Sequence, residues 1–347
     1  MPFRNSFLPA AFLVLVPLLT TYHWFSERAL SLQYEVLSSA KDYEWQQILP
    51  AGNGSHQYEW KSGSFPMGII PILAFDGKLW MTGQKASWSS SDGITWVHHP
   101  KKDWGERINL TSVFFNNTLW MYGGMQYQDR QLLNEVWYST DGVQWQQAEN
   151  AAWAPRKGQS MVAFRGKLWL FGGVSKVSKD FVSLEMKNDV WSSADGFHWT
   201  NEVEQAPWAP RDSPAVLVLR DTLYLLSGQG LADVWRSPDG KSWTQLTSEA
   251  PWEKRFDNGA LVFDDKLWVF GGRDTTADHH RAAQNDVWYS ANGGNWTRQA
   301  EHAPWTVRSG GHSVVFKNQL WLFSGKHTGA NPVWKGDIWA LKKSESR

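Results

Sequence analysis

The chain has 347 residues, with 34 basic and 34 acidic side chains, no cysteine and 25 tryptophans. The balanced charge excludes attraction by net charge as a basis for binding nucleic acid or an acidic membrane surface, and we predict no nucleic-acid partner. The absence of cysteine excludes disulfides, thiolate metal sites and cysteine nucleophiles.

The N-terminal part of the chain carries an apolar segment. Residues 7–24 are uncharged and mostly apolar, and Arg4 precedes them, which is the pattern of a membrane-targeting segment. Small residues suited to cleavage occur only at Ala29-Leu30-Ser31, well beyond the apolar core, which favours an uncleaved anchor over a signal peptide. We expect residues 1–28 to be a signal anchor or signal peptide and residues 29–40 a linker. The domain at 41–347 would then be membrane-anchored outside the cytoplasm, periplasmic or extracellular, or secreted if the segment is cleaved.

A single unit recurs through residues 41–347 with a period of roughly fifty residues. In its third copy, apolar runs at 160–164 and 167–171 flank Arg165-Gly166, and runs at 190–193 and 198–201 flank Ala194-Asp195-Gly196. Apolar runs joined by such short turns predict β-hairpins. Each unit is therefore expected to be a four-stranded antiparallel meander.

There are six second strands but only five complete outer hairpins. The chain stops soon after "GDIWALKK", a third strand, whereas "DYEWQQIL" at 42–49 resembles a fourth strand with no unit before it. We expect this N-terminal strand to complete the last unit and close the six units into a ring, because closure removes free sheet edges.

Tryptophan marks the register of the repeats. All but three of the 25 tryptophans fall in four columns: the second, third and fourth strands and a Trp-x-x-Arg motif. Large flat side chains at equivalent positions are expected to fill the wedges between neighbouring twisted sheets. We interpret the strand columns as core and not as a sugar-binding platform.

The repeats resemble those of the kelch family. The resemblance rests on second strands ending in Gly-Gly at 123/124, 172/173 and 271/272, followed by a spaced aromatic residue and tryptophan. The outer turn, SxDGxxW, is also similar to the Asp-box of sialidase-type propellers but is one residue shorter, and we interpret it as turn chemistry. The resemblance implies an all-β, six-bladed β-propeller of four-stranded kelch-type blades. It does not imply one function, because kelch propellers include protein-binding adaptors, galactose oxidase and a bacterial epimerase acting on N-acetylneuraminate. Galactose oxidase is excluded because its copper radical requires a cysteine crosslinked to tyrosine.

The Trp-x-x-Arg motif supplies the predicted ligand-binding residues, which are Arg107, Arg156, Arg211, Arg255 and Arg308. In a meander, the loop entering the first strand and the loop joining the second and third strands emerge on the same face. The arginines should therefore share a face with the long inserts at 125–133, 174–187, 273–284 and 326–336. Five guanidinium groups around one opening would attract an anionic ligand such as a sugar acid, an acidic peptide or a sulfated glycan.

The same arginines have a structural interpretation. Each of their units also carries an acid just before the third-strand tryptophan, at Glu135, Asp189, Asp233, Asp286 and Asp337. The first unit has Met67 and Ser87 at these two positions. Because the arginine and the acid are either both present or both absent in a unit, we predict a salt bridge between them that crosses the glycine end of the second strand. The two roles are compatible, since a bidentate carboxylate uses only two of the five guanidinium donors.

The remaining motifs predict neither a metal site nor a cofactor. The histidine pairs His98-His99 and His279-His280 lack further ligands at metal spacing and are expected to be solvated loop residues. The sequence favours an extracytoplasmic recognition module that binds a protein or an anionic carbohydrate on the long-loop face. The alternative is a carbohydrate-active enzyme resembling a sialic acid epimerase or mutarotase, in which an arginine holds the sugar carboxylate and an acid moves protons. A sialidase is less favoured, because the tyrosine and acid nucleophile that it needs have no place in the pattern.

Overall fold

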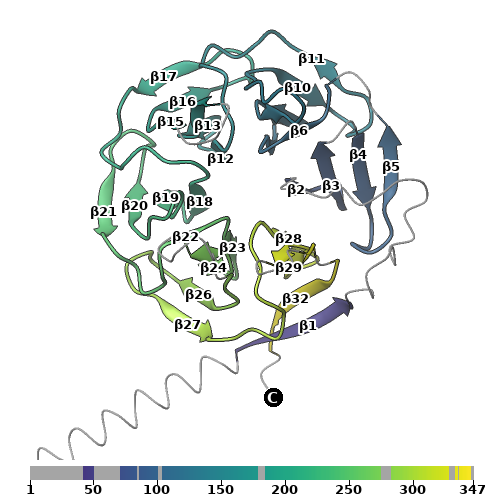
Figure 1. Cartoon of the computed structure of the whole chain (residues 1–347), viewed down its shortest axis with the longest axis vertical. Coiled ribbons are helices and arrows are strands. Elements are labelled where there is room, and N and C mark those ends of the chain that lie inside the picture. The colour runs from purple at the N-terminus through teal and green to yellow at the C-terminus, as the bar shows by residue number, and fades with distance from the viewer. Residues whose placement is uncertain are drawn as a thin grey trace, which may run out of the picture.

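The computed structural model describes residues 42–50, 71–83, 86–100, 104–178, 184–274, 283–327, 333–334 and 336–344. Within these residues, six four-stranded sheets, called blades 1 to 6 in chain order, surround a common axis (Figure 1). All pairings within the blades are antiparallel. This arrangement confirms the all-β, six-bladed propeller.

The blades run from an inner strand beside the axis to an outer strand at the rim. Blade 1 contains β2 (Ile72–Phe75), β3 (Lys78–Gly83), β4 (Ala86–Ser90) and β5 (Val97–Pro100); blade 2 contains β7 (Thr111–Phe115), β8 (Thr118–Tyr122), β10 (Val136–Ser139) and β11 (Gln146–Gln147). Blade 3 contains β12 (Ser160–Phe164), β13 (Lys167–Phe171), β16 (Val190–Ser193) and β17 (Thr200–Val203); blade 4 contains β18 (Ala215–Leu219), β19 (Thr222–Leu226), β20 (Val234–Ser237) and β21 (Thr244–Thr247). Blade 5 contains β23 (Gly259–Phe263), β24 (Lys266–Phe270), β26 (Val287–Ser290) and β27 (Thr297–Ala300); blade 6 contains β28 (His312–Phe316), β29 (Gln319–Phe323), β32 (Ile338–Lys343) and β1 (Tyr43–Leu49).

The N-terminal strand closes the ring as predicted. Strand β1 pairs antiparallel with β32, in a register that runs from Tyr43 opposite Lys343 to Leu49 opposite Ile338. Tyr43 also reaches the preceding blade, because its hydroxyl donates a 2.5 Å hydrogen bond to Asp264 of blade 5. The closing strand is therefore bonded to two blades at once.

The outer turns connect each blade to the one before it. In blade 2, the carboxylate of Asp141 accepts the backbone N–H groups of Val143 and Gln144 at 2.8 and 2.7 Å. The following glycine, Gly142, has φ +74°, and a Cβ there would lie 2.4 Å from the Trp80 ring of blade 1. The same close approach pairs Gly93 with Trp321, Gly196 with Trp120, Gly240 with Trp169 and Gly293 with Tyr224. The interpretation of SxDG as turn chemistry is confirmed, and its glycine is required for packing between blades.

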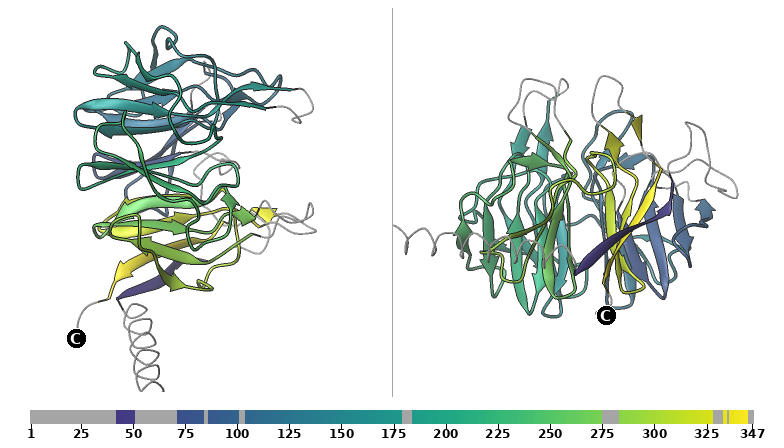
Figure 2. Two further views of the ribbon diagram at one scale, coloured as in Figure 1. Left: turned by 90° about the vertical axis from the view of Figure 1, so that its left-hand side faces the viewer. Right: turned by 90° about the horizontal axis from the view of Figure 1, so that it is seen from below.

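The two faces of the ring differ as expected. Two-stranded sheets join Trp-x-x-Arg loops to inserts: β6 (Arg107–Ile108) with β9 (Met125–Gln126), and β22 (Arg255–Phe256) with β25 (Arg273–Asp274). Further small sheets form within inserts: β14 (Val174–Val177) with β15 (Leu184–Met186), and β30 (Lys326–His327) with β31 (Val333–Trp334). We call this side the long-loop face and the opposite side, which carries both sets of tight turns, the short-turn face (Figure 2).

One strand boundary was predicted wrongly. The fourth strand of blade 3 was expected at 198–201, but β17 spans Thr200–Val203. Asp195 accepts the backbone N–H groups of Phe197 and His198 at 2.9 and 2.8 Å, which keeps both residues in the turn.

The predicted N-terminal segment at 1–28 and the linker at 29–40 lie outside the described residues. Among the residues that are described, none belongs to a helix long and apolar enough to cross a membrane.

Candidate functional site

The five repeat arginines are buried beneath the long-loop face. Their relative exposure is between 0 and 2%, and the tryptophan of each Trp-x-x-Arg motif is also buried. The guanidinium of Arg156 lies over the ring of Trp153, 5.6 Å from its centroid, and Arg211 and Arg308 lie similarly over their own motif tryptophans. The motif therefore forms a compact unit in which the aromatic ring covers the charge.

Each arginine forms the predicted salt bridge within its own blade. Arg211 shows the pattern: it donates to both carboxylate oxygens of Asp233 at 2.7 and 2.8 Å and to the carbonyl of Ser227, at the end of the second strand, at 2.8 Å. The third-strand Trp235 donates its indole N–H to the same carboxylate at 2.7 Å. Equivalent bidentate pairs join Arg156 to Asp189, Arg255 to Asp286 and Arg308 to Asp337. The arginine thus ties strand one to strand three across the end of strand two.

The Arg107 pair of blade 2 departs from this pattern. Arg107 contacts one oxygen of Glu135 at 2.7 Å, and that carboxylate is more exposed than the aspartates of the other pairs. Burial lowers the pKa of Arg107, and its contact with Glu135 opposes that shift. In blade 1, Ser87 at the acid position is buried and donates to the carbonyl of Gly142 in blade 2, 2.7 Å away. Met67, at the arginine position, lies outside the described residues.

These contacts support the structural role of the arginines. Arg156 uses its Nε for the carbonyl of Ala154, and with its other bonds it engages four of its five N–H donors. Guanidinium groups this buried and this fully paired form no open cationic rim. Ligand binding by these five arginines stays a prediction. The candidate site lies beside them, at the residues that follow each arginine in the chain.

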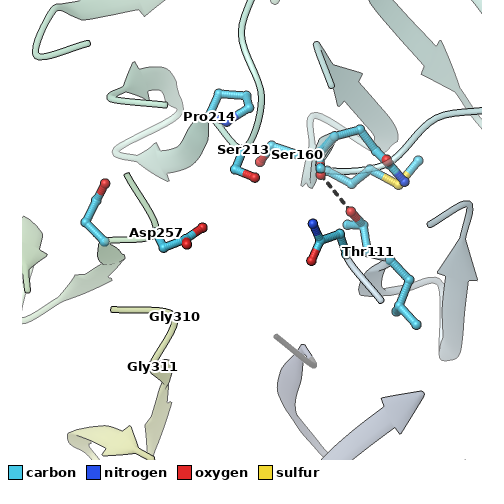
Figure 3. Close-up of a pocket in the computed structure, with 13 residues that line it drawn as sticks. Thr111, Ser160, Ser213, Pro214, Asp257, Gly310 and Gly311 are labelled. Atoms are coloured by element: carbon cyan, nitrogen blue, oxygen red, sulfur yellow. Dashed lines mark hydrogen bonds between the residues drawn. The ribbon is translucent and has the colours of Figure 1, made fainter. Parts of the chain in front are cut away.

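A cavity of about 230 Å³ opens at the axis of the ring, where the inner strands begin. Most of its wall comes from the second and third residues after each repeat arginine: Asn109, Leu110, Gly158, Gln159, Ser213, Pro214, Asp257, Asn258, Gly310 and Gly311. Thr111, Ser160 and Met161, at the start of the inner strands of blades 2 and 3, complete it. Figure 3 shows Ser213, Asp257 and Thr111 approaching one opening from three different blades. We call this space the channel-mouth cavity.

Backbone geometry holds the cavity wall in place. The second residue after each arginine has a positive φ, at 52° for Asn109, 62° for Gly158, 54° for Ser213, 55° for Asp257 and 64° for Gly310. Backbone N–H groups at this position donate from one blade to the carbonyl of the blade before: Gly158 to Asn109 at 3.0 Å, Ser213 to Gly158 at 2.7 Å and Gly310 to Asp257 at 2.9 Å. Glycine, asparagine and aspartate tolerate the left-handed conformation best, which explains most of this column.

A buried polar atom at the cavity wall lacks a partner. Gln159 is 5% exposed; its amide N–H donates to the carbonyl of Tyr122 at 3.1 Å, but its Oε1 accepts no hydrogen bond from the protein. Its backbone carbonyl accepts the hydroxyl of Thr111 at 2.7 Å, the bond drawn in Figure 3. The Oε1 atom has almost no accessible surface of its own, so this unpaired acceptor is enclosed by protein atoms and is not open to the cavity.

The charges near the cavity are compensated by close partners. The ammonium of Lys157 lies 2.7 Å from Asp212, and both side chains are buried. The hydroxyl of Ser213 donates to the same carboxylate at 3.0 Å. Asp257, which lines the cavity, lies 2.9 Å from the guanidinium of Arg273. The cavity therefore offers hydroxyl, amide and backbone groups together with one ion-paired carboxylate.

The described residues contain no group of three or more metal-ligating side chains. The expectation that His98 and His99 are solvated loop residues is wrong, because both belong to strand β5 and are half-buried. His98 packs on Trp88, and His99 stacks on Trp80 and contacts the hydroxyl of Ser89 at 2.9 Å. The second pair, His279-His280, lies outside the described residues.

Sequence reasoning missed the channel-mouth cavity. The available signal was the column two residues after each arginine, where Asn, Gly, Ser, Asp and Gly occur. These residue types favour turns and positive φ, so the column could have indicated a shared tight conformation at one place in five of the six units.

The fold and cavity define a six-bladed β-propeller with a polar opening at its axis. No family model and no curated protein matches the chain. Among solved structures, the one titled "Structure of YjhT" is similar, with a TM-score of 0.66 and 16% sequence identity over 80% of this chain and 95% of that chain. At this identity the similarity shows the propeller fold alone. The kelch assignment therefore remains a resemblance, and 449 matching chains of solved structures mark a fold too widespread to identify a function.

Proposed function

We propose that this propeller is a recognition module that binds a ligand at the channel-mouth cavity. The observation that carries the proposal is a preformed cavity at the ring axis, to which Thr111, Ser213 and Asn258 contribute hydroxyl and amide groups from three different blades. Such groups can hydrogen-bond a polar ligand. The four long inserts rise on the same face, and loops of this kind on a rigid scaffold commonly add contacts to a ligand.

The lining favours a neutral, hydroxyl-rich ligand over an anion. The five repeat arginines are paired with carboxylates. Lys157, which precedes the lining residue Gly158, and Arg273, which contacts the lining residue Asp257, also have carboxylate partners. A volume of about 230 Å³ lies below the range typical of drug-sized pockets, which begins at about 300 Å³. We therefore propose a neutral glycan that places one sugar ring in the cavity.

The test is binding of the full chain to an array of neutral and acidic glycans, followed by titration of the best ligand. Replacing Asn258 by Leu removes an amide from the cavity wall and should weaken binding by about five- to tenfold, the equivalent of one hydrogen bond of about 1 kcal/mol. The matched control is Gln144→Leu, an exposed glutamine on the short-turn face that should leave binding unchanged. Equal affinity for both variants would reject the site. Binding to acidic glycans alone would reject the ligand class.

The alternative function is a sugar mutarotase or epimerase of the sialic acid type. It is favoured by the Asp257–Arg273 pair, which places one carboxylate and one guanidinium at the cavity edge. NMR measurement of sialic acid mutarotation with the full chain, and with Asp257→Asn, tests it. Acceleration that disappears in the variant would establish the enzyme, and an unchanged rate with the wild-type chain would exclude it.

We also propose that residues 7–24 hold the propeller at a membrane, with the repeats outside the cytoplasm. This proposal is supported by the apolar segment and by Arg4 ahead of it. The chain should float with membranes, and protease added from outside the cytoplasm should reach the propeller. Recovery of the intact chain from the soluble cytoplasmic fraction would contradict this.

A further inference from the structure

Both ends of the propeller leave from the short-turn face. Strand β1 begins at Tyr43, whose hydroxyl is bonded to Asp264 in a tight turn of blade 5, and β32 ends opposite it at Lys343. The backbone N–H of Ser344 donates to the carbonyl of Asp42 at 2.8 Å, which keeps the two ends together. Any tether that precedes Asp42 therefore approaches the propeller from this side.

The same face exposes apolar side chains at the tips of its outer turns. Ile94, Val143 and Phe197 each follow the turn glycine in blades 1, 2 and 3, and they are 40, 37 and 42% exposed. Val97, directly after the first of these turns, is 53% exposed. Four of the six large hydrophobic residues exposed in the described part of the chain thus lie in or beside the outer turns of three consecutive blades.

The fold does not require apolar residues at this position. The equivalent residue is Lys241 in blade 4 and Gly294 in blade 5, and those turns form the same hydrogen bonds between the turn side chain and the backbone. Phe197 gains some internal packing, since its ring lies edge-on to Trp120 at 4.9 Å. The ring nevertheless remains 42% exposed. One apolar tip on each of three consecutive blades gives this face three separate points at which it can contact an apolar layer.

We infer that the short-turn face rests on the membrane surface, with Ile94, Val143 and Phe197 entering its interfacial layer. This inference rests on the proposed membrane anchor. The 17 residues between Trp24 and Asp42 span at most about 60 Å when extended, so the tether permits contact without forcing it. Aromatic and aliphatic side chains at loop tips are suited to the boundary between headgroups and acyl chains. The long-loop face and its cavity then point away from the membrane, where a ligand can reach them.

The charges of the face indicate which lipid it contacts. Asp92, Asp141, Asp195 and Asp239 hold the outer turns beside the apolar tips, and each accepts backbone N–H groups as a carboxylate. The two arginines of the inner turns, Arg165 and Arg220, are paired with Asp221 and Asp265. Lys78 and Lys317, at the inner turns of blades 1 and 6, add positive charge, which the four aspartates of the outer turns offset. The face therefore carries both signs of charge and gains little from anionic headgroups, so the partner we assign is a zwitterionic bilayer.

The experiment uses the natural absence of cysteine in the chain. Val143→Cys on the short-turn face and, as a matched control, Tyr127→Cys on the long-loop face, which is 64% exposed, are each labelled with an environment-sensitive fluorophore. The full chain is reconstituted into phosphatidylcholine vesicles containing nitroxide-labelled lipid, and vesicle flotation is measured alongside the fluorescence. The fluorophore at Val143 should be quenched at least twofold by the nitroxides, and the one at Tyr127 should not.

The outcomes separate this inference from the proposed anchor. If the chain floats with the vesicles but the fluorophore at Val143 is no more quenched than that at Tyr127, the anchor stands and the membrane-facing surface is overturned. If the chain does not float, the anchor fails and the inference fails with it. A blue shift at Val143 in lipid-free detergent that grows with protein concentration would instead show a second copy covering the face, and would also overturn it.

Discussion

Replacing Arg211 by Met tests whether the repeat arginine is a structural element. The side chain is fully buried, and its guanidinium makes four hydrogen bonds, two of them to the Asp233 carboxylate and the others to the carbonyls of Ala209 and Ser227. The variant leaves Asp233 as a buried charge without its cation. Breaking a buried pair in this way costs about 3–5 kcal/mol of unfolding free energy.

The assay is urea-induced unfolding followed by tryptophan fluorescence, with Arg165→Met as the control. Arg165 also pairs with an aspartate, Asp221, but the two side chains are 51 and 64% exposed. Loss of an exposed pair costs about 0–1 kcal/mol. The double variant Arg211→Met/Asp233→Leu removes both charges and should recover most of the loss. If Arg211→Met unfolds like the control while ligand binding is abolished, the structural interpretation is refuted and the arginine is a ligand contact.

The same pair has a pH dependence of known sign. Burial alone would raise the pKa of Asp233, but the hydrogen bonds and charge of Arg211 outweigh burial and hold the pKa below its ordinary value of 3.8. A carboxyl group with a lowered folded-state pKa contributes stability above its unfolded pKa and loses it as pH falls through the folded value. The contribution of the pair in the wild-type chain should therefore be complete above about pH 5 and shrink below about pH 4. In Arg211→Met burial acts alone and raises the pKa of Asp233, so the loss of stability in the variant should begin to shrink at a higher pH than this.

Two further perturbations follow from the turns. Gly142→Ala should destabilise the propeller by about 1–3 kcal/mol more than Gly166→Ala. Both glycines have positive φ, but only at Gly142 would an added Cβ collide with the Trp80 ring. Chemical denaturation of the two variants measures the difference, and equal losses of stability would show that backbone strain alone matters. NMR titration should show a pKa of His198 above its ordinary value of 6.5, because Asp195 accepts a hydrogen bond from the imidazole and stabilises its positive charge. Asp195→Asn should lower the pKa of His198 towards 6.5. An unchanged pKa in this variant would mean that the two side chains do not interact in solution.

The fold was predictable because the same local pattern occurs six times. The apolar runs at 160–164 and 167–171 coincide with β12 and β13, and Arg165-Gly166 forms the turn between them with both φ angles positive. Ring closure was predictable by counting strands, since the orphan strand at 42–49 had one vacant partner. The start of β17 was missed because the side chain of Asp195 competes for the backbone groups that follow it.

The site was less predictable because charge pairs and cavities depend on contacts between distant residues. The salt bridge between each arginine and its acid could be inferred from the sequence, because five units contain both residues and the first unit contains neither. The orphan acceptor of Gln159 could not, because its burial depends on Tyr122 in the neighbouring blade and on Thr111 beside it. His98 and His99 were misplaced for a related reason: tryptophan rings of blade 1 cover a segment that looks polar in sequence.

Around the ring axis, some residues are the same in five blades and others differ from blade to blade. The arginine recurs in five blades because it has the same structural role in each of them: its salt bridge joins the first and third strands across the end of the second. The third residue after the arginine differs among these five blades, being Leu110, Gln159, Pro214, Asn258 and Gly311, although all five line one cavity. The backbone places these five positions symmetrically around the axis, but their side chains are all different. The cavity wall is therefore asymmetric, and any selectivity between ligands would come from these side chains. If the channel-mouth cavity binds the proposed ligand, binding should respond to changes at Asn258, and changes at the arginines should act through stability.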